Sequence, residues 1–337
     1  MGDGRYRSFS VVLLLALLLV VAVFASLTLG RYAVPWEELW GFVMSGGSQG
    51  IDETTGNVLF HMRLPRVAAA VLVGASLAAA GCAFQGIFKN PMVSPDLLGA
   101  SAGAGFGAAL GILLSLGGAG VEVCAFVAGL AAVGISYFLS AAIGRALSGV
   151  LVLVLSGMVI GNLFQAFTSA VKFVADPNSQ LPEITFWLMG GLSAVREGDL
   201  LWLGSAALTG GAGLLALRWK MNVMANGDEE AMSLGIQVKR VRLAVVAFAT
   251  LLTSASVAIA GMVGWVGLIV PHLARFLVGA DQRILLPTSM ILGATFLLVV
   301  DDFCRSIYTT EIPLSILTSI IGAPLFVYLI ARTRRSH

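Results

Sequence analysis

Long apolar runs, separated by short polar or proline-containing segments, recur along the whole chain. A helix needs about 20 apolar residues to cross a hydrocarbon core of about 30 Å. Ten runs approach that length, at 9–29, 64–84, 93–114, 121–141, 150–173, 199–217, 241–262, 264–279, 284–303 and 312–331. Runs of this length satisfy their backbone hydrogen bonds in lipid as helices, so we expect no strands. The pattern predicts an all-α polytopic membrane protein with about ten transmembrane helices, folded as one transmembrane domain over residues 1–337.

The composition agrees with a membrane protein and excludes other classes. Hydrophobic residues make up 58% of the chain and charged residues 11%, with a mean hydropathy of +0.94, which is not expected of a water-soluble domain. The net charge of +2 is not gathered on one soluble face, so we expect membrane lipid and no nucleic acid as a partner. Unrelated spacings favour core positions over a disulfide or a metal site for the three cysteines, Cys82, Cys124 and Cys304.

The charge distribution across the predicted spans indicates an orientation. With the N-terminus in the cytoplasm, fourteen of the twenty basic residues fall on the cytoplasmic side, as the positive-inside rule prefers. Both termini are then cytoplasmic. Residues 30–62 form an extracytoplasmic segment, and residues 218–240 form a cytoplasmic loop.

Three arginines are exceptions, because they lie at the outer ends of predicted helices: Arg63, Arg66 and Arg305. A charge at such a place is costly enough to suggest a function. A local structural role is the alternative. The first two could hold the nearby acids Asp52 and Glu53, and the third could pair with Asp301, four residues earlier on the same helix face.

A weak internal repeat relates the two halves of the chain. A shift of 180 positions aligns 75–81 ("ASLAAAG") with 255–261 ("ASVAIAG") and Pro91 with Pro271. By the span count the two copies cross the membrane in opposite directions, as in the inverted-topology repeats of many transporters. Small residues recur easily in membrane helices, so close packing alone is the alternative.

The fifth apolar run carries a polar stripe. Its members fall at helical spacing on one face: Met158, Asn162, Gln165 and Ser169. Amides that face lipid would be costly, so the stripe contacts either other helices or a water-filled path. We predict a translocation path for a bulky, partly apolar solute, with helix packing as the alternative.

The largest cytoplasmic loop, "RWKMNVMANGDEEAMSLGIQVKRVR", has the pattern of a short capped helix. Asn226 or Asp228 can cap it, Glu229 and Glu230 suit its first turn, and Gly235 can end it. An amphipathic connector is the alternative. The chain contains no G-x-x-x-x-G-K-[ST] motif, so energy for transport must come from a gradient or from another polypeptide.

Longer motifs follow in order from about residue 60 to the C-terminus. They are "RLPR", "GASLAAAGCAFQGIFKNPMVSPDLLGASAGA", "GWVGLIVPHLARFLVGADQRILLP", "ILGATFLLVVDDFCR" and "EIPLSILTSIIGAPLFVYLI". Together with the loop segment "EEAMSLG", they resemble the FecCD family, the permeases of bacterial ATP-binding-cassette (ABC) importers for iron chelates, haem and cobalamin. Gln282 and Ser315 depart from the family pattern, at positions where histidine and glycine are common.

The resemblance implies a type II ABC importer permease with an inverted repeat in the bacterial inner (plasma) membrane. Such a permease forms a homodimer or a paralogous heterodimer, works with two ATPase subunits and receives its substrate from an extracytoplasmic binding protein. It is not itself an enzyme and holds no covalently bound cofactor; ATP and Mg²⁺ belong to the partner ATPase. The favoured substrate is a ferric siderophore, with haem or cobalamin as alternatives.

The resemblance also implies roles for individual residues. By this resemblance, the binding protein docks on Arg63, Arg66 and Arg305. The residues that would couple the permease to the ATPase are Asp228, Glu229, Glu230, Ala231, Leu234 and Gly235. The small residues Ser148 and Gly149 resemble an inner gate. We expect no catalytic residue.

Two other classes of protein compete with this interpretation. A gradient-driven secondary transporter needs ionisable or cation-coordinating groups near the midplane, and the sequence offers few. An intramembrane enzyme needs a nucleophile, a base and metal ligands at plausible spacing, and no such set gathers.

Overall fold

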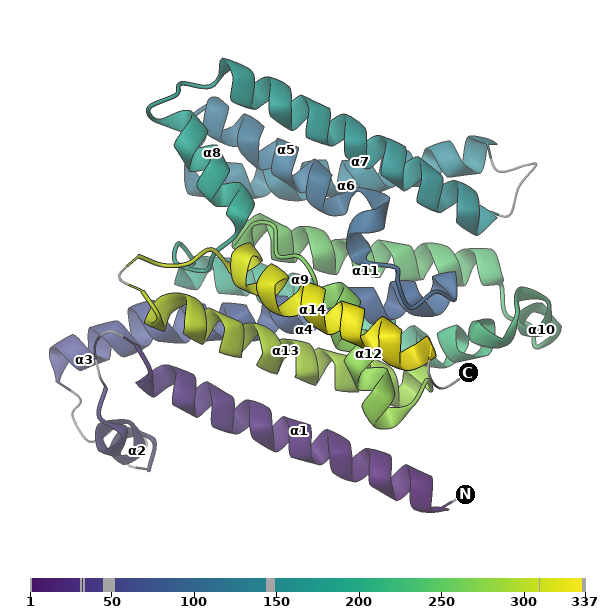
Figure 1. Ribbon diagram of the computed structural model, residues 1–337, viewed down its shortest axis with the longest axis horizontal. Coiled ribbons are helices and arrows are strands. Elements are labelled where there is room, and N and C mark those ends of the chain that lie inside the picture. Colours follow the sequence, from purple (N-terminus) through teal and green to yellow (C-terminus); the bar gives the residue numbers. More distant parts are fainter. Residues whose placement is uncertain are drawn as a thin grey trace.

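Helices form the regular elements of the computed structural model (Figure 1). The structure describes residues 2–30, 32, 34–44, 52–143, 149–308 and 310–334. The apolar helices are α1 (Gly2–Thr28), α4 (Leu64–Phe88), α5 (Ala100–Leu113), α6 (Gly117–Ile143), α7 (Gly149–Val174), α9 (Glu197–Asn226), α11 (Val238–Ala260), α12 (Val266–Val278), α13 (Gln282–Ser306) and α14 (Leu314–Arg334). Shorter elements are α2 (Trp36–Met44), α3 (Glu53–Asn57), α8 (Gln180–Met189), α10 (Asp228–Ser233), the π-helical turn η1 (Val58–Arg63) and the 3₁₀ turn η2 (Pro95–Leu98).

The ten apolar helices correspond one to one to the ten predicted runs, so the predicted all-α membrane fold is confirmed. Within the described residues, seven helices are long and apolar enough to cross a membrane, and α5, α12 and α14 are the shorter apolar ones. The third predicted run begins too early, because Pro95 starts the separate turn η2 and Gly99 has a φ of +86° before α5. The helices α2 and α8 are absent from the prediction because they are too short to show a membrane pattern.

The centre of the bundle is α4. In the span that contains it, 78% of the most apolar window is buried, against 17% for α1. A Cβ atom on Gly74 would lie 2.3 Å from the carbonyl oxygen of Gly293 on α13, and one on Gly81 would lie 1.8 Å from that of Gly267 on α12. Close backbone contact through small residues is how membrane helices associate, since lipid is as apolar as their side chains.

The order of elements supports the predicted inverted repeat. The helices α4 and α11, which carry the two copies, pack against each other. Each is followed by a break, at 89–99 and at 261–265, and then by a short apolar helix, α5 or α12. Two further apolar helices complete each half, namely α6 and α7 or α13 and α14.

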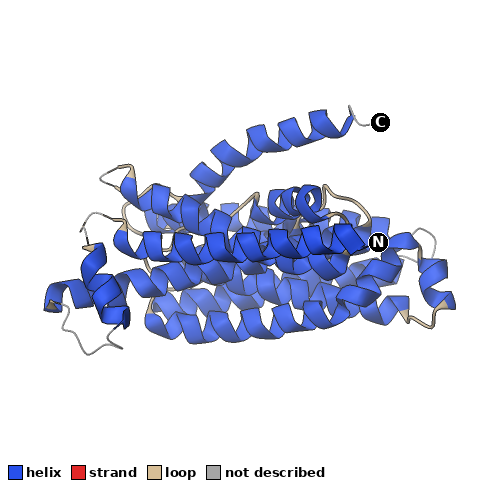
Figure 2. Ribbon diagram, turned by 90° about the horizontal axis from the view of Figure 1, so that it is seen from below, coloured by secondary structure: helices blue, strands red, loops and turns tan. Residues whose placement is uncertain are grey.

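The two ends of the bundle carry different elements. The end with α2, α3 and the C-terminus of α13 is called the arginine end, after Arg63, Arg66 and Arg305 (Figure 1). The opposite, coupling end carries α10, the start of α1 and the end of α14, which leans away from the other helices (Figure 2). The expected loop 218–240 is mostly helical, since α9 continues to Asn226 and α11 begins at Val238.

Candidate functional site

Arg63 lies under the chain that leaves α1 and is only 5% exposed. Its Nη1 donates to the carbonyl oxygens of Leu27 at 2.7 Å and Thr28 at 3.1 Å, and its Nη2 donates to that of Tyr32. The last carbonyls of a helix have no partner within it and carry partial negative charge. Arg63 therefore caps the C-terminus of α1.

Arg66 connects α4 to α13 and to the segment before α14. Its Nε and Nη2 donate to the two carboxylate oxygens of Asp301 at 2.8 and 2.9 Å, and its Nη1 donates to Glu311 at 2.8 Å. The side chain of Asp301 is 0% exposed, that of Arg66 12% and that of Glu311 40%. The guanidinium is thus fixed on its buried side and has a more accessible partner on its outer side.

Arg305 links α13 to α1. Its Nη2 donates to the Ser26 hydroxyl at 2.7 Å and to the Asp302 carboxylate at 2.5 Å, and that hydroxyl donates to Asp302 at 2.6 Å. The expected pairing of Arg305 with Asp301 is wrong, because Arg66 occupies Asp301.

The first two arginines also have structural partners, but not the acids that the local alternative named. Asp52 and Glu53 are not among the described partners of Arg63 or Arg66, which bind the carbonyl oxygens at the end of α1 and the acids of α13 and of the segment before α14. The three arginines instead form one polar layer that joins α1, α4 and α13. Arg66 has one partly exposed partner, Glu311, whereas the other two arginines are buried against α1.

The helix α10 forms an exposed knob at the coupling end. Ala231 is fully buried and anchors it, while its outer surface carries Glu229, Glu230, Leu234 and Gly235. Gly235 has a φ of +79°, and its N–H donates to the carbonyl oxygen of Met232 at 2.9 Å. The predicted end of the helix at Gly235 is confirmed, since glycine adopts this left-handed conformation without steric cost.

Asp228 holds α10 to the bundle. Its carboxylate accepts a hydrogen bond from Arg242 on α11 at 2.8 Å and lies 3.7 Å from the Lys89 ammonium after α4. The predicted cap at Asn226 or Asp228 is wrong, because Gly227 occupies the N-cap position. These ion pairs connect α10 to α11 and to the residue that follows α4.

A cavity of about 700 Å³ lies along α7 and is lined by all four residues of the predicted path, Met158, Asn162, Gln165 and Ser169. We call it the α7 cavity. The turn η2 and α5 contribute to its wall, and α14 contributes Ser315 and Ser319. The four stripe residues are exposed, so helices of this chain do not bury them in the way that the packing alternative requires.

Sequence reasoning missed several polar residues of the α7 cavity: Asp96, Ser101, Thr168, Lys172, Ser315 and Ser319. Asp96 is the acid and Lys172 the cation of the described lining. A carboxylate between Pro95 and a glycine-rich apolar run was a usable signal for Asp96. The serines of α14 had none, since only the tertiary structure places α14 at the wall of the same cavity. Of the predicted gate, Gly149 begins α7, and Ser148 lies outside the described residues.

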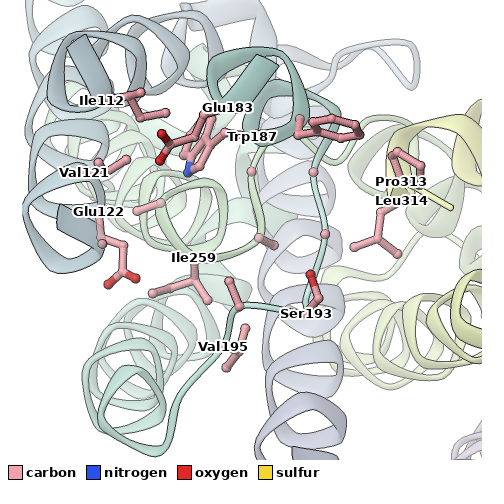
Figure 3. Close-up of a pocket in the computed structure, with 18 of the residues that line it drawn as sticks. Ile112, Val121, Glu122, Glu183, Trp187, Ser193, Val195, Ile259, Pro313 and Leu314 are labelled. Carbon is pink, nitrogen blue, oxygen red and sulfur yellow. The ribbon is translucent and has the colours of Figure 1, made fainter. Parts of the chain in front are cut away.

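A second cavity, of about 850 Å³, opens at the arginine end (Figure 3). Glu122 on α6 and Glu183 on α8 lie on one side of it, and Pro313 and Leu314 lie on the other. Arg66 is also part of its lining, together with Asp301 and Glu311. The unpredicted helix α8 therefore helps to form the wall beside the arginine layer.

The sequence matches the model of the FecCD transport family over residues 18–332. The chain belongs to the FecCD family. A molybdate import system permease of Haemophilus influenzae is 37% identical over 322 residues, which cover 95% of each chain. A cobalamin import system permease of Halobacterium salinarum is 38% identical over 320 residues, or 93% of this chain and 85% of that protein. A hemin transport system permease of Yersinia pestis is 35% identical over 98% of both chains.

A solved chain supports the same assignment. It comes from an ABC transporter described as of the metal-chelate type, in an inward-facing conformation, and it has a TM-score of 0.86 and 37% identity over 96% of this chain and 99% of that one. This FecCD protein is therefore a multi-pass membrane permease of an ABC importer. The gradient-driven carrier is not supported, and permease subunits of this kind are not themselves enzymes.

Proposed function

We propose that this FecCD permease carries a ferric siderophore and that the α7 cavity is its path. The supporting observation is the cavity wall, in which apolar side chains, amides, hydroxyls and thioethers surround about 700 Å³, with Asp96 and Lys172 as the charged residues of the described lining. A bulky, partly apolar chelate suits a large cavity with few fixed charges. Haem and cobalamin, which relatives carry by name, are the alternatives for the same path.

The proposed assembly contains two permease copies, two ATPase subunits and an extracytoplasmic binding protein. Exposed apolar side chains of α7, including Val159 and Leu163, flank the path, and a second copy packed there would close its open side. The outer surface of α10 would dock in the ATPase, which supplies the ATP and Mg²⁺. The permease itself needs no covalently bound cofactor.

The proposed orientation places the coupling end in the cytoplasm of a bacterium and the arginine end outside its inner membrane. Several basic residues at the coupling end support this orientation by the positive-inside rule: Lys89, Arg218, Lys220, Lys239 and Arg283. Both termini would then be cytoplasmic. Arg66 would face the binding protein through the carboxylate-accessible Nη1 that Glu311 now occupies.

Transport would proceed by alternating access. ATP binding would bring the two ATPases together, and α10 would follow them and displace α11 through the ion pair of Asp228 with Arg242. The path would then open to one side at a time. A partner shifts a conformational equilibrium only by binding the two states differently, so α10 must contact nucleotide-bound and free ATPase in different ways.

The experiment that tests this proposal measures uptake into proteoliposomes that hold the complete transporter and its binding protein. The solutes are a ferric hydroxamate siderophore, haem, cobalamin and molybdate. We expect ATP-dependent uptake of the siderophore. A siderophore that is not taken up, while one of the other three is, would refute the substrate assignment.

Molybdate is a second candidate because a relative of 37% identity and 95% coverage carries that name. A small dianion needs cationic or hydrogen-bond-donating groups along its path, and Lys172 is the cation in the described lining of the α7 cavity. If molybdate is the substrate, Lys172→Gln should lower its uptake several-fold. Siderophore uptake should be much less sensitive to that change.

A further inference from the structure

We propose that Asp96 is the charge-selecting residue of the α7 cavity and that it favours metal chelates of positive or zero charge over polyanionic chelates and oxyanions. The inference rests on the proposed role of this cavity as the path. It adds a specificity-determining residue to the polar stripe of α7.

The turn η2 packs directly against α7 and thereby places Asp96 at the cavity wall. A Cβ atom on Gly157 of α7 would lie 2.2 Å from the carbonyl oxygen of Leu97 and 2.8 Å from the Cα of Leu98. Gly161, four residues later, lies against Gly99, where the turn ends with a φ of +86°. This Gly-x-x-x-Gly spacing lets the two backbones approach closely.

The carboxylate of Asp96 is part of the cavity wall. Ser101 donates a hydrogen bond to Oδ1, and Asp96 is exposed and belongs to the cavity lining. No lysine or arginine in the described part of the chain forms an ion pair with it. The hydroxyl orients the carboxylate and leaves its other oxygen for a passing solute.

Lys172 is too distant to neutralise Asp96. It follows Gly157 and Gly161, on which η2 sits, by 15 and 11 residues of the same helix. At 1.5 Å per residue the separation along α7 is roughly 16–22 Å, which exceeds the Debye length of about 8 Å at physiological ionic strength. The α7 cavity therefore has a cation toward one end and an acid toward the other, and each acts locally.

A carboxylate in the wall discriminates by charge. At about 8 Å in a medium as polar as water, it changes the local concentrations of a monocation and a monoanion in opposite directions by about twofold each. Lower permittivity inside the cavity increases the effect. Selection against a multiply charged anion is correspondingly stronger.

The direct test measures the charge of the cavity with thiol reagents. Cys82, Cys124 and Cys304 are replaced by alanine, and Gln165→Cys introduces one thiol in the α7 cavity of the full transporter. The rates of modification by a cationic trimethylammonium and an anionic sulfonate methanethiosulfonate are compared. We expect Asp96→Asn to lower the cation-to-anion rate ratio at least about threefold, whereas Glu53→Gln, which removes an exposed acid at the arginine end, should not change it.

An unchanged ratio in Asp96→Asn overturns the proposal. If Asp96→Asn does not fold, the rate ratio is instead measured in Asp96→Glu and in the parent protein at several ionic strengths. The ratio in Asp96→Glu and in the parent protein should then fall as salt screens the carboxylate. A ratio that does not depend on salt also overturns the proposal.

The second test uses transport and separates the two proposals. Uptake of a cationic and of an anionic ferric chelate is compared in the parent transporter and in Asp96→Asn. We expect the preference for the cationic chelate to fall several-fold. If the parent transports neither chelate, the substrate proposal fails, while the labelling ratio still decides the role of Asp96.

Discussion

The guanidinium of Arg66 on α4 forms a two-point ion pair with the carboxylate of Asp301 on α13, with N–O distances of 2.8 and 2.9 Å. The two residues are 235 positions apart in the chain, and Asp301 is fully buried. Parallel hydrogen bonds of this kind fix the orientation of arginine. The third nitrogen, Nη1, is therefore held in one place, where Glu311 accepts its hydrogen bond. Arg66 thus forms a buried structural ion pair with two of its nitrogens and presents the third to a more accessible partner.

Breaking the buried half of this arrangement should destabilise the protein. Arg66→Met leaves the Asp301 charge buried without its partner, which typically costs about 3–5 kcal/mol. The double change Arg66→Met with Asp301→Leu should cost less than the sum of the single changes. Unfolding in detergent, followed for all members of the double-mutant cycle, measures the coupling; additive losses would show that the pair is not coupled.

The accessible half of the arrangement should control docking. Glu311→Gln removes the carboxylate that competes for Nη1 of Arg66, so the binding protein should associate about two- to fivefold more tightly, in the range of one exposed ion pair. Arg63→Glu together with Arg66→Glu should weaken the complex strongly. Affinity is measured with the loaded binding protein and the purified transporter. Equal affinity in the parent, in Glu311→Gln and in the double variant would show that Arg66 is not part of the interface.

Reversal of charge on the exposed surface of α10 should uncouple transport from ATP hydrolysis. Glu230→Arg changes this surface without touching the anchor formed by Asp228 and Arg242. We expect uptake to fall at least about tenfold, since a loss of roughly 1.4 kcal/mol of coupling is tenfold, while ATP hydrolysis continues. Glu38→Arg, at the exposed helix α2, is the matched charge reversal and should transport normally. Full uptake by Glu230→Arg would exclude α10 as the docking knob.

Loss of one amide from the polar stripe should change the path and leave the assembly intact. Gln165→Leu removes a hydrogen-bonding group from the wall of the α7 cavity. We expect uptake to fall several-fold while the transporter still purifies with its ATPase. Ser205→Ala, which removes an exposed hydroxyl on α9, is the control. Parent-level uptake of every tested solute by Gln165→Leu would show that the stripe has no role in transport.

The stability of the turn between α7 and α8 should depend on pH, through the protonation of Asp176. The backbone N–H of Asn178 and the hydroxyl and N–H of Ser179 hold the pKa of this carboxyl below its ordinary value. Because the folded-state pKa is lowered, the stabilisation is present above the unfolded pKa of about 3.9 and is lost as pH falls through the folded pKa. At neutral pH, Asp176→Ala should speed hydrogen exchange at the amides of Asn178 and Ser179.

The same exchange experiment at low pH provides the control for Asp176. After correction for intrinsic exchange rates, the difference between Asp176→Ala and the parent should shrink once the carboxyl is protonated. A difference that stays constant from neutral to acidic pH would assign the effect to loop packing rather than to the carboxylate.

The helices, their order and the family could be predicted from the amino-acid sequence. Hydrophobic length is a local property, because each membrane helix satisfies its own backbone hydrogen bonds, so the apolar runs predicted α4 or α13 without knowledge of their neighbours. The same locality made the polar stripe of α7 visible, since Met158, Asn162 and Gln165 share a face through helical spacing alone. Gly235 ended α10 as predicted because its conformational freedom is also local.

Which charges meet across helices depended on the tertiary structure. Asp301 and Asp302 are adjacent in the sequence, yet Asp301 pairs with Arg66 on α4, whereas Asp302 pairs with Arg305 of its own helix and accepts a hydrogen bond from Ser26 of α1. The cavity beside α7 likewise needs η2 and α14, whose residues carry no shared pattern with α7. Side-chain partners across helices depend on how the helices are rotated and packed. Hydrophobic periodicity encodes that rotation only coarsely, so the ion pairs and the position of Asp96 became evident only in the folded chain.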